Sequence, residues 1–161
     1  MKRKLTHLDR EGRARMVDVG QKPASPRRAR ASGFVRMAAS TLELVADGAL
    51  AKGDVLAVAR LAGIQAAKQT PHLVPLCHVL PLDHVDVDVR VDRERCGVTI
   101  EASVACRAAT GAEMEAIVAV SIAAATVYDM CKSVERGIRV EEIELIEKSG
   151  GRSGHWTRSD D

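Results

Sequence analysis

The sequence predicts an α+β protein with a ferredoxin-like split βαβ antiparallel sheet and helices packed on one face. Valine alternates with charged residues over residues 85–91, and apolar residues alternate again over residues 98–106, which is typical of two neighbouring strands. Segments with apolar residues at helical spacing precede and follow this pair. The resulting order of strand, helices, strand, strand, helix and strand is that of the split βαβ fold.

The start of the chain is expected to be irregular. Residues 1–31 contain glycine, proline and serine without a sustained apolar period, so we expect a basic and partly flexible segment that is largely loop. A short apolar run, Phe34–Ala39, predicts the first strand. Ser40 or Thr41 can then cap a helix that ends at Asp47–Gly48.

The middle of the chain carries clearer signals. The second predicted helix begins after Asp54, which is a good N-cap residue, and stops at Thr70–Pro71, because proline interrupts a helix. The two alternating strands come next, and residues 92–97 supply the turn that joins them into a hairpin.

The last two elements are a long helix and a strand. The helix is expected from about Ala112 to Val134, and apolar residues surround its axis, whereas a helix on the surface of a monomer keeps a polar face. We therefore expect a partner subunit to cover it. The final strand, Ile138–Ile146, changes its apolar phase near Glu141–Glu142, which predicts a β-bulge.

Composition and charge narrow the class of protein. The chain has 161 residues, 46% apolar and 29% charged, and we expect one domain over residues 1–161. Only three residues are aromatic, which argues against modules that stack nucleic-acid bases. Residues 1–30 hold ten Lys or Arg against three Asp or Glu. This arm could bind nucleic acid or a phosphorylated metabolite, or could simply be solvated.

The sequence also predicts the compartment. The longest stretch without charge or proline, Ala116–Tyr128, is shorter than the roughly 20 residues that span a bilayer, so no integral membrane protein is expected. The basic start, Met1–Lys4, lacks the following apolar block of a signal peptide. The four cysteines form no C-x-x-C pair, so we expect reduced thiols and a cytoplasmic protein. A zinc site from Cys77, His78 and His84 is conceivable but lacks paired ligand spacing, and no metal site is predicted.

Polar residues flank the third predicted helix at both ends. Glu113 and Glu115 could complement the positive helix N-terminus or serve a ligand. Asp129 and Lys132 are three residues apart and can pair, either as an ordinary solvated pair or as part of a site. Glu115 and Asp129 are separated by about 21 Å at 1.5 Å per residue, so a small ligand cannot reach both. If both ends serve one ligand, helices from two subunits must meet.

Two further segments could carry chemistry. His78 lies in the proline-rich apolar connection of residues 71–82, which would hold its imidazole for proton transfer or phosphate binding, although such a histidine is more often structural. The glycine-containing tail covers residues 150–161. At its start, two cations, Lys148 and Arg152, lie among three glycines. This arrangement could bring backbone N–H groups to an anion, or could fray.

Several segments, taken together, resemble one known family. They are Met16–Val19, Lys52–Asp54, Ala62–Lys68, Leu76–His78, Gly111–Ala116, Tyr128–Lys132 and Lys148–Gly151. In this order, over about residues 5–154, the chain resembles the molybdenum cofactor biosynthesis protein C family, the cyclic pyranopterin monophosphate synthases. Val79 stands where the family pattern has proline, and Arg152 stands where the family often has lysine.

The resemblance implies an assembly and a reaction. It implies a ferredoxin-like subunit in a homohexamer, a trimer of dimers, with active sites at the dimer interfaces. The implied reaction is that of a lyase, which converts (8S)-3′,8-cyclo-7,8-dihydroguanosine 5′-triphosphate into cyclic pyranopterin monophosphate and diphosphate during molybdopterin biosynthesis. No cofactor is firmly implied, although magnesium could accompany the triphosphate. Neither a nucleic-acid nor a membrane partner is expected.

The resemblance also implies roles for individual residues. Asp129 would be a general acid/base, Lys132 its partner and proton donor, and Lys52 a second catalytic cation. The residues expected to contact the substrate are Leu76, Cys77, His78, Glu113, Met114, Glu115, Lys68 and Lys148, and those expected to close over the triphosphate are Lys22, Arg27 and Arg28. Because crowded lysines disfavour each other's charged forms, a lysine of this site could have a pKa lowered toward neutrality.

Two other classes of function stay open on the sequence. The chain could be a non-catalytic oligomeric carrier of a pterin or nucleotide, which would bind the substrate without releasing diphosphate. It could also be a basic-armed RNA-binding protein, whose affinity would fall steeply with salt and would depend on residues 1–30.

Overall fold

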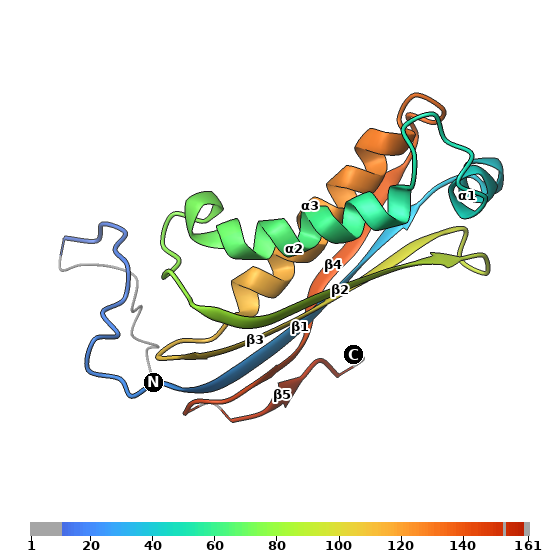
Figure 1. The fold of residues 1–161 in the computed structure, drawn as a ribbon. Coiled ribbons are helices and arrows are strands. Elements are labelled where there is room, and N and C mark those ends of the chain that lie inside the picture. The colour runs from blue at the N-terminus through green and yellow to red at the C-terminus, as the bar shows by residue number, and fades with distance from the viewer. Residues whose placement is uncertain (1–10, 153, 160–161) are drawn as a thin grey trace.

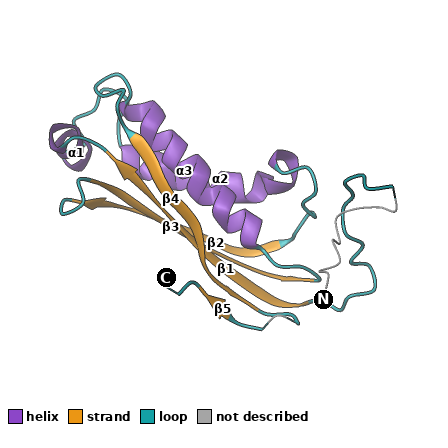
Figure 2. Cartoon of the chain, turned by 180° about the vertical axis from the view of Figure 1, so that it is seen from behind, coloured by secondary structure: helices purple, strands orange, loops and turns teal. Residues whose placement is uncertain are grey.

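Two long helices lie across one face of an antiparallel sheet in the computed structural model, which describes residues 11–152 and 154–159 (Figures 1 and 2). The elements in chain order are β1 (Ser25–Arg36), α1 (Ala39–Ala46), α2 (Val55–Leu73), β2 (Leu82–Asp92), β3 (Gly97–Ala108), α3 (Glu113–Cys131), β4 (Arg139–Ser149) and β5 (Trp156–Thr157). The strand order across the sheet is β2-β3-β1-β4-β5. The α+β, split βαβ prediction is confirmed, because α1 and α2 connect β1 to β2, and α3 connects β3 to β4.

The expectation that residues 25–31 form a loop is wrong, because β1 begins at Ser25. This strand lies in the interior of the sheet and pairs with β3 on one side and β4 on the other. Its helix-facing positions include Ala29, Ala31 and Gly33, which are buried but too small to give a strong apolar signal. Arginines occupy alternate positions on the opposite face. The strand also ends at Arg36, before the predicted limit at Ala39.

The ends of α1 and α2 show which local signals decide a helix boundary. Asp54 caps α2 as predicted, since its carboxylate accepts a hydrogen bond of 3.0 Å from the Ala57 N–H. The predicted stop at Thr70–Pro71 is wrong, because α2 continues to Leu73 and the Val74 N–H donates to the Thr70 carbonyl. Helix α1 likewise begins at Ala39 without a side-chain cap, rather than behind Ser40 or Thr41.

Strand β4 contains the predicted bulge. Its pairing with β1 shifts register between Ser32 and Phe34, and Glu142 has a positive φ of 53° at that point. A second shift lies between Arg30 and Ala31. The extra residue bends β4 and restores the inward orientation of its apolar side chains further along the strand.

Helix α3 forms the centre of the core. Its buried positions include Ala116, Ala119, Val120, Ala123 and Val127, and it packs against α2 and the sheet. In the described part of the chain, α3 is the one helix that is long and apolar enough to cross a membrane, but more than half of that stretch is buried inside the structure, as in a core helix. It ends at Cys131, before the predicted limit at Val134.

One face of α3 is open in the single chain. Met114 and Ile122 keep 36% and 38% of their surface exposed, and the neighbouring β4 adds Ile143 at 36%. An apolar face of this kind suits contact with another protein surface. The expectation that a partner subunit covers it stays a prediction.

Glycine at position 97 is required by the packing of Phe34. A Cβ at Gly97 would overlap the Phe34 ring and the Val35 carbonyl, and the carbonyl cannot move without breaking the ladder between β1 and β3. We predict that Gly97→Ala lowers the free energy of unfolding by about 1–3 kcal/mol, as overpacking does. Urea denaturation of the variant and of the unmodified protein measures this change in the free energy of unfolding. Gly137→Ala, whose Cβ would meet one atom at 3.8 Å, should change stability little, and equal effects of the two variants would contradict this account.

Candidate active site

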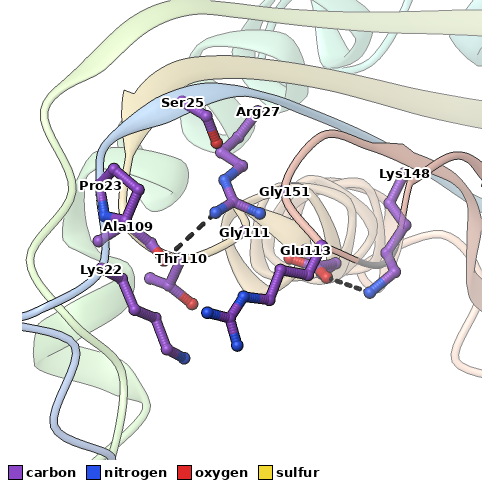
Figure 3. A pocket seen from close by; sticks show the side chains of 11 residues that line it. Lys22, Pro23, Ser25, Arg27, Ala109, Thr110, Gly111, Glu113, Lys148 and Gly151 are labelled. Atoms are coloured by element: carbon purple, nitrogen blue, oxygen red, sulfur yellow. Dashed lines mark hydrogen bonds and ion pairs between the residues drawn. The ribbon is translucent and has the colours of Figure 1, made fainter.

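A charged cavity of about 620 Å³ lies at the start of α3 (Figure 3). Four cations line it, two from residues 22–27 and two from residues 148–152: Lys22, Arg27, Lys148 and Arg152. The remaining lining residues are Pro23, Ser25, Ala109, Thr110, Gly111, Glu113 and Gly151. The excess of positive charge makes this cavity suitable for a multiply charged anion.

Arg27 is the best fixed of these cations. Its Nε donates to the Ala108 carbonyl at 3.2 Å, and its Nη2 donates to the Ala109 carbonyl at 3.3 Å. Arg27 was expected to belong to a flexible arm, but it lies in β1. Arg28, the next residue of the strand, is exposed and is not among the residues that line the cavity, because successive strand residues face opposite sides.

Lys148 and Glu113 form an ion pair across the cavity. Lys148 Nζ and Glu113 Oε1 are 2.8 Å apart, and both side chains are about one-third exposed or less. The pair joins the end of β4 to the first residue of α3, as Figure 3 shows. Glu113 therefore keeps the Lys148 ammonium in place, and an incoming anion would have to compete with it.

A second cavity of about 380 Å³ adjoins the first. Both are lined by Lys22, Thr110, Gly111 and Glu113, and the second one adds Val17, Val19, Leu76, Cys77, His78, Leu80, Met114 and Glu115. The His78 Nε2 lies 2.8 Å from the Val17 carbonyl oxygen. Because a carbonyl can only accept, Nε2 carries the proton, and in the neutral ring Nδ1 is an acceptor. The second cavity thus has fewer charged lining residues than the first, and the His78 imidazole is held in its wall.

Burial controls the protonation of two groups here. Glu115 is 3% exposed, and burial raises its pKa above the usual 4.5, with a smaller contribution from the negative charge of Glu113. Burial, and then the charge of Glu115, raise the pKa of the Cys77 thiol above its usual 9.0. Cys77 is therefore a thiol at neutral pH, which argues against its use as a nucleophile.

The second cluster lies at the other end of α3. The Asp129 carboxylate is within 2.9 Å of Lys52 Nζ and within 2.6 Å of Lys132 Nζ. Lys52 comes from the loop before α2, and it also donates to the Asp129 backbone carbonyl at 2.6 Å. All three side chains are roughly half exposed, and the two lysines line a depression of about 330 Å³ with Tyr128, Ser133 and Arg136.

The charges of this second cluster stabilise one another. The hydrogen bond from Lys132, and then that from Lys52, lower the pKa of Asp129 from 3.8 to about 2. The same bond raises the pKa of Lys132. The expectation of a lysine with a pKa lowered toward neutrality is therefore wrong for Lys132 in the single chain, because the hydrogen bond and charge of Asp129 outweigh the lowering effect of desolvation.

The structure brings some of the predicted site residues together and separates others. Leu76, Cys77, His78, Glu113, Met114, Glu115 and Lys148 meet at the start of α3, whereas Lys52, Asp129 and Lys132 meet at its end. The two groups are about 21 Å apart along the helix. Lys68 is exposed on α2 and lines neither of the two cavities at the start of α3.

Sequence reasoning missed the groups that hold Arg27. The carbonyls of Ala108 and Ala109 and the cavity-lining Thr110 lie about 80 residues away from it in sequence, and no local pattern marks a backbone acceptor. Among the described residues, no group of three or more His, Cys, Asp or Glu is arranged to hold a metal ion.

Known proteins resemble this chain over nearly its whole length. The family model described as the MoaC family matches residues 16–151. The chain belongs to the MoaC family. A relative from Thermomicrobium roseum, named cyclic pyranopterin monophosphate synthase, is 58% identical over 157 residues, which are 98% of this chain and 95% of the relative. A relative of that name from Chloroflexus aurantiacus is 56% identical over 154 residues, covering 96% and 94%.

A mycobacterial protein is similar to the chain to the same degree. A protein of Mycobacterium tuberculosis named cyclic pyranopterin monophosphate synthase 1 is 56% identical over 155 residues, which are 96% of this chain and 91% of that protein. The match to the MoaC family model includes the cluster at the end of α3 and every lining residue of the two cavities at its start except Arg152. The resemblance drawn from the sequence is confirmed.

The ion pairs of Asp129 predict that removing either lysine raises the pKa of Asp129, and that removing Lys132 raises it more. Lys132→Ala should raise the pKa of Asp129 from about 2 toward 3.8, and Lys52→Ala should raise it less, because Lys132 makes the larger contribution. The carboxyl carbon shift in NMR titrations measures this. Because the pKa is lowered in the folded chain, the stabilising effect is present above pH 3.8 and is lost as the pH falls toward 2.

The matched control for this titration is Arg136→Ala. Arg136 lines the same depression but does not contribute to the lowered pKa, so its removal should leave the titration of Asp129 unchanged. An equal shift in all three variants, or an Asp129 that titrates near 3.8 in the unmodified protein, would contradict the assignment.

Proposed function

We propose that this chain is a cyclic pyranopterin monophosphate synthase, a lyase of molybdenum cofactor biosynthesis. It converts (8S)-3′,8-cyclo-7,8-dihydroguanosine 5′-triphosphate into cyclic pyranopterin monophosphate and diphosphate. The observation that carries this proposal is the similarity to relatives of this name, which are 56–58% identical over nearly the whole chain. The chain also has a polar cluster at each end of α3.

The adjoining cavities at the start of α3 fit the two halves of such a substrate. The charged cavity holds Lys22, Arg27 and Lys148, which suit a triphosphate. The second cavity, which has fewer charged side chains, holds Leu76, His78 and the buried Glu115, which suit a flat heterocycle that carries hydrogen-bonding groups. The negative charge of Glu113 lies between them and pairs with Lys148.

The reaction needs proton transfers and one phosphoryl displacement. The bridged purine ring is opened and rebuilt as a pyranopterin, which requires groups that give and take protons. A hydroxyl of the intermediate then attacks the α-phosphorus, the bond from that phosphorus to the diphosphate oxygen breaks, and the hydroxyl proton passes to a base. No electrons are gained or lost. The cluster of Lys52, Asp129 and Lys132 supplies an ionised carboxylate with two ammonium groups for these transfers.

Each active site is composed of two copies of the chain in this proposal. The two clusters cannot meet on one helix of this length, so one protomer supplies the start of its α3 and its partner supplies the end. The open apolar face of α3 at Met114 and Ile122 supports contact between copies. The assembly we propose is the homohexamer, a trimer of dimers.

The cysteines and the arginines of the chain bear on its cellular compartment and on the RNA-binding alternative. The cysteines Cys77, Cys96, Cys106 and Cys131 are all free, which fits a reducing compartment, and we place the enzyme in the cytoplasm. Within the described part of the basic segment, Arg27 is bonded to two carbonyls, and Arg30 of the same strand pairs with Glu101 and Glu147. These arginines are engaged within the fold, which favours the enzyme over an RNA-binding protein.

Diphosphate release is the direct test. The purified protein should release diphosphate from the cyclised nucleotide, and parallel reactions with and without magnesium determine whether the metal accompanies the triphosphate. A carrier would bind the same molecule with no release.

Asp129→Ala and Lys132→Ala should each keep the oligomer but lower turnover by about 100-fold or more, since general acid–base groups contribute at least that much. Near-normal rates in either variant would refute the role of that residue.

Mixing inactive variants tests the composite site. His78→Ala damages the start of α3, and Lys132→Ala damages the end, so a mixed dimer has one site with both defects and one site with none. Random exchange of subunits should therefore restore about a quarter of the normal activity. Lys52→Ala mixed with Lys132→Ala is the control, because both defects lie in one cluster and no intact site can form. Recovery in both mixtures, or in neither, would rule out this arrangement.

A further inference from the structure

We propose that Gly151 is a positioning residue for phosphate binding, because its missing side chain leaves the space in which the Arg27 guanidinium is held. This inference rests on the proposed function and adds to it. Gly151 lies in the turn that connects β4 to β5, and it lines the charged cavity beside Arg27 (Figure 3).

Arg27 is held by two of its three side-chain nitrogens. Nε donates to the Ala108 carbonyl and Nη2 donates to the Ala109 carbonyl, so the plane of the guanidinium is fixed relative to the end of β3. The structure gives Nη1 no hydrogen-bond partner among the described residues. A cation that is oriented before the ligand arrives loses little freedom when it binds an oxyanion.

The guanidinium lies against the backbone of Gly151. A Cβ built on Gly151 would overlap Arg27 Nη1 and would come within 2.5 Å of Cζ and 2.8 Å of Nη2. These atoms belong to the end of a flexible side chain rather than to the backbone. An alanine at position 151 would therefore displace the guanidinium from its two carbonyl acceptors and leave the sheet in place.

A second glycine of the same turn provides a matched control. Gly151 has a φ of +69° and Gly154 has a φ of +66°, so an alanine at either position pays nearly the same conformational cost. A Cβ at Gly154 would have nothing within 4 Å. The two substitutions differ in the contact with Arg27 and in position, because Gly151 lines the charged cavity and Gly154 does not.

Binding of inorganic diphosphate to the full-length protein, measured by isothermal titration calorimetry, tests the proposal. Gly151→Ala should weaken binding by about tenfold or more, the scale of one charge-assisted hydrogen-bonded contact, while Gly154→Ala should bind as the unmodified protein does. Thermal unfolding of both variants reports the shared backbone cost. Equal affinities of the two variants, or no binding of diphosphate to the unmodified protein, would overturn the proposal.

A double substitution distinguishes positioning from a general structural effect. In the Arg27→Ala background, Gly151→Ala should cause no additional loss of diphosphate affinity, because the group that Gly151 accommodates is gone. With the cyclised substrate, Gly151→Ala should raise KM while kcat stays within about twofold. An additive loss in the double variant would overturn the proposal. If diphosphate binding follows these expectations but the unmodified protein releases no diphosphate from substrate, the proposed function fails and the positioning role stands.

Discussion

Helix α3 sets the geometry on which the rest of the structure depends. It runs without interruption through the core, and its alanines at 116, 119 and 123 are fully buried. The close packing leaves little room for a side chain at Gly33 in β1 and Gly63 in α2, because a Cβ there would press on Val120 or on the Ala119 carbonyl. Because α3 is one uninterrupted helix from Glu113 to Cys131, Glu115 and Asp129 lie about 21 Å apart in each chain. Chemistry that needs both ends is therefore chemistry between chains.

The charged groups at both ends are already paired before any ligand binds. Lys148 pairs with Glu113, and Asp129 pairs with Lys52 and Lys132, all at exposed or partly exposed positions. Ion pairs in such positions contribute little net stability, so a polyanion can exchange these partners at small cost. The carboxylates thus hold the lysine side chains in place in the absence of ligand. Arg27 is held instead by two backbone carbonyls, which a bound anion does not have to displace.

Local periodicity predicted the elements that have one charged face and one apolar face, such as β2 and β3, and it located the bulge at Glu142. It failed for the first half of β1, where Ala29 and Ala31 face the helices and the pairing with β3 and β4 decides the conformation. Site prediction followed the same division. Asp129 and Lys132 could be paired from their spacing, whereas the contact of Arg27 with Gly151 joins residues at opposite ends of the chain and has no local signature.

The two carboxyl groups at the ends of α3 differ in the way that acid–base chemistry requires. Burial raises the pKa of Glu115, while two ammonium groups lower that of Asp129. Environments that shift the pKa values of two carboxyl groups in opposite directions make one group the weaker acid and the other the stronger acid. A single chain keeps them apart at opposite ends of one helix. In the proposed dimer, the start of α3 in one protomer would meet the end of α3 in its partner, and one site would combine the carboxyl group of raised pKa with the one of lowered pKa.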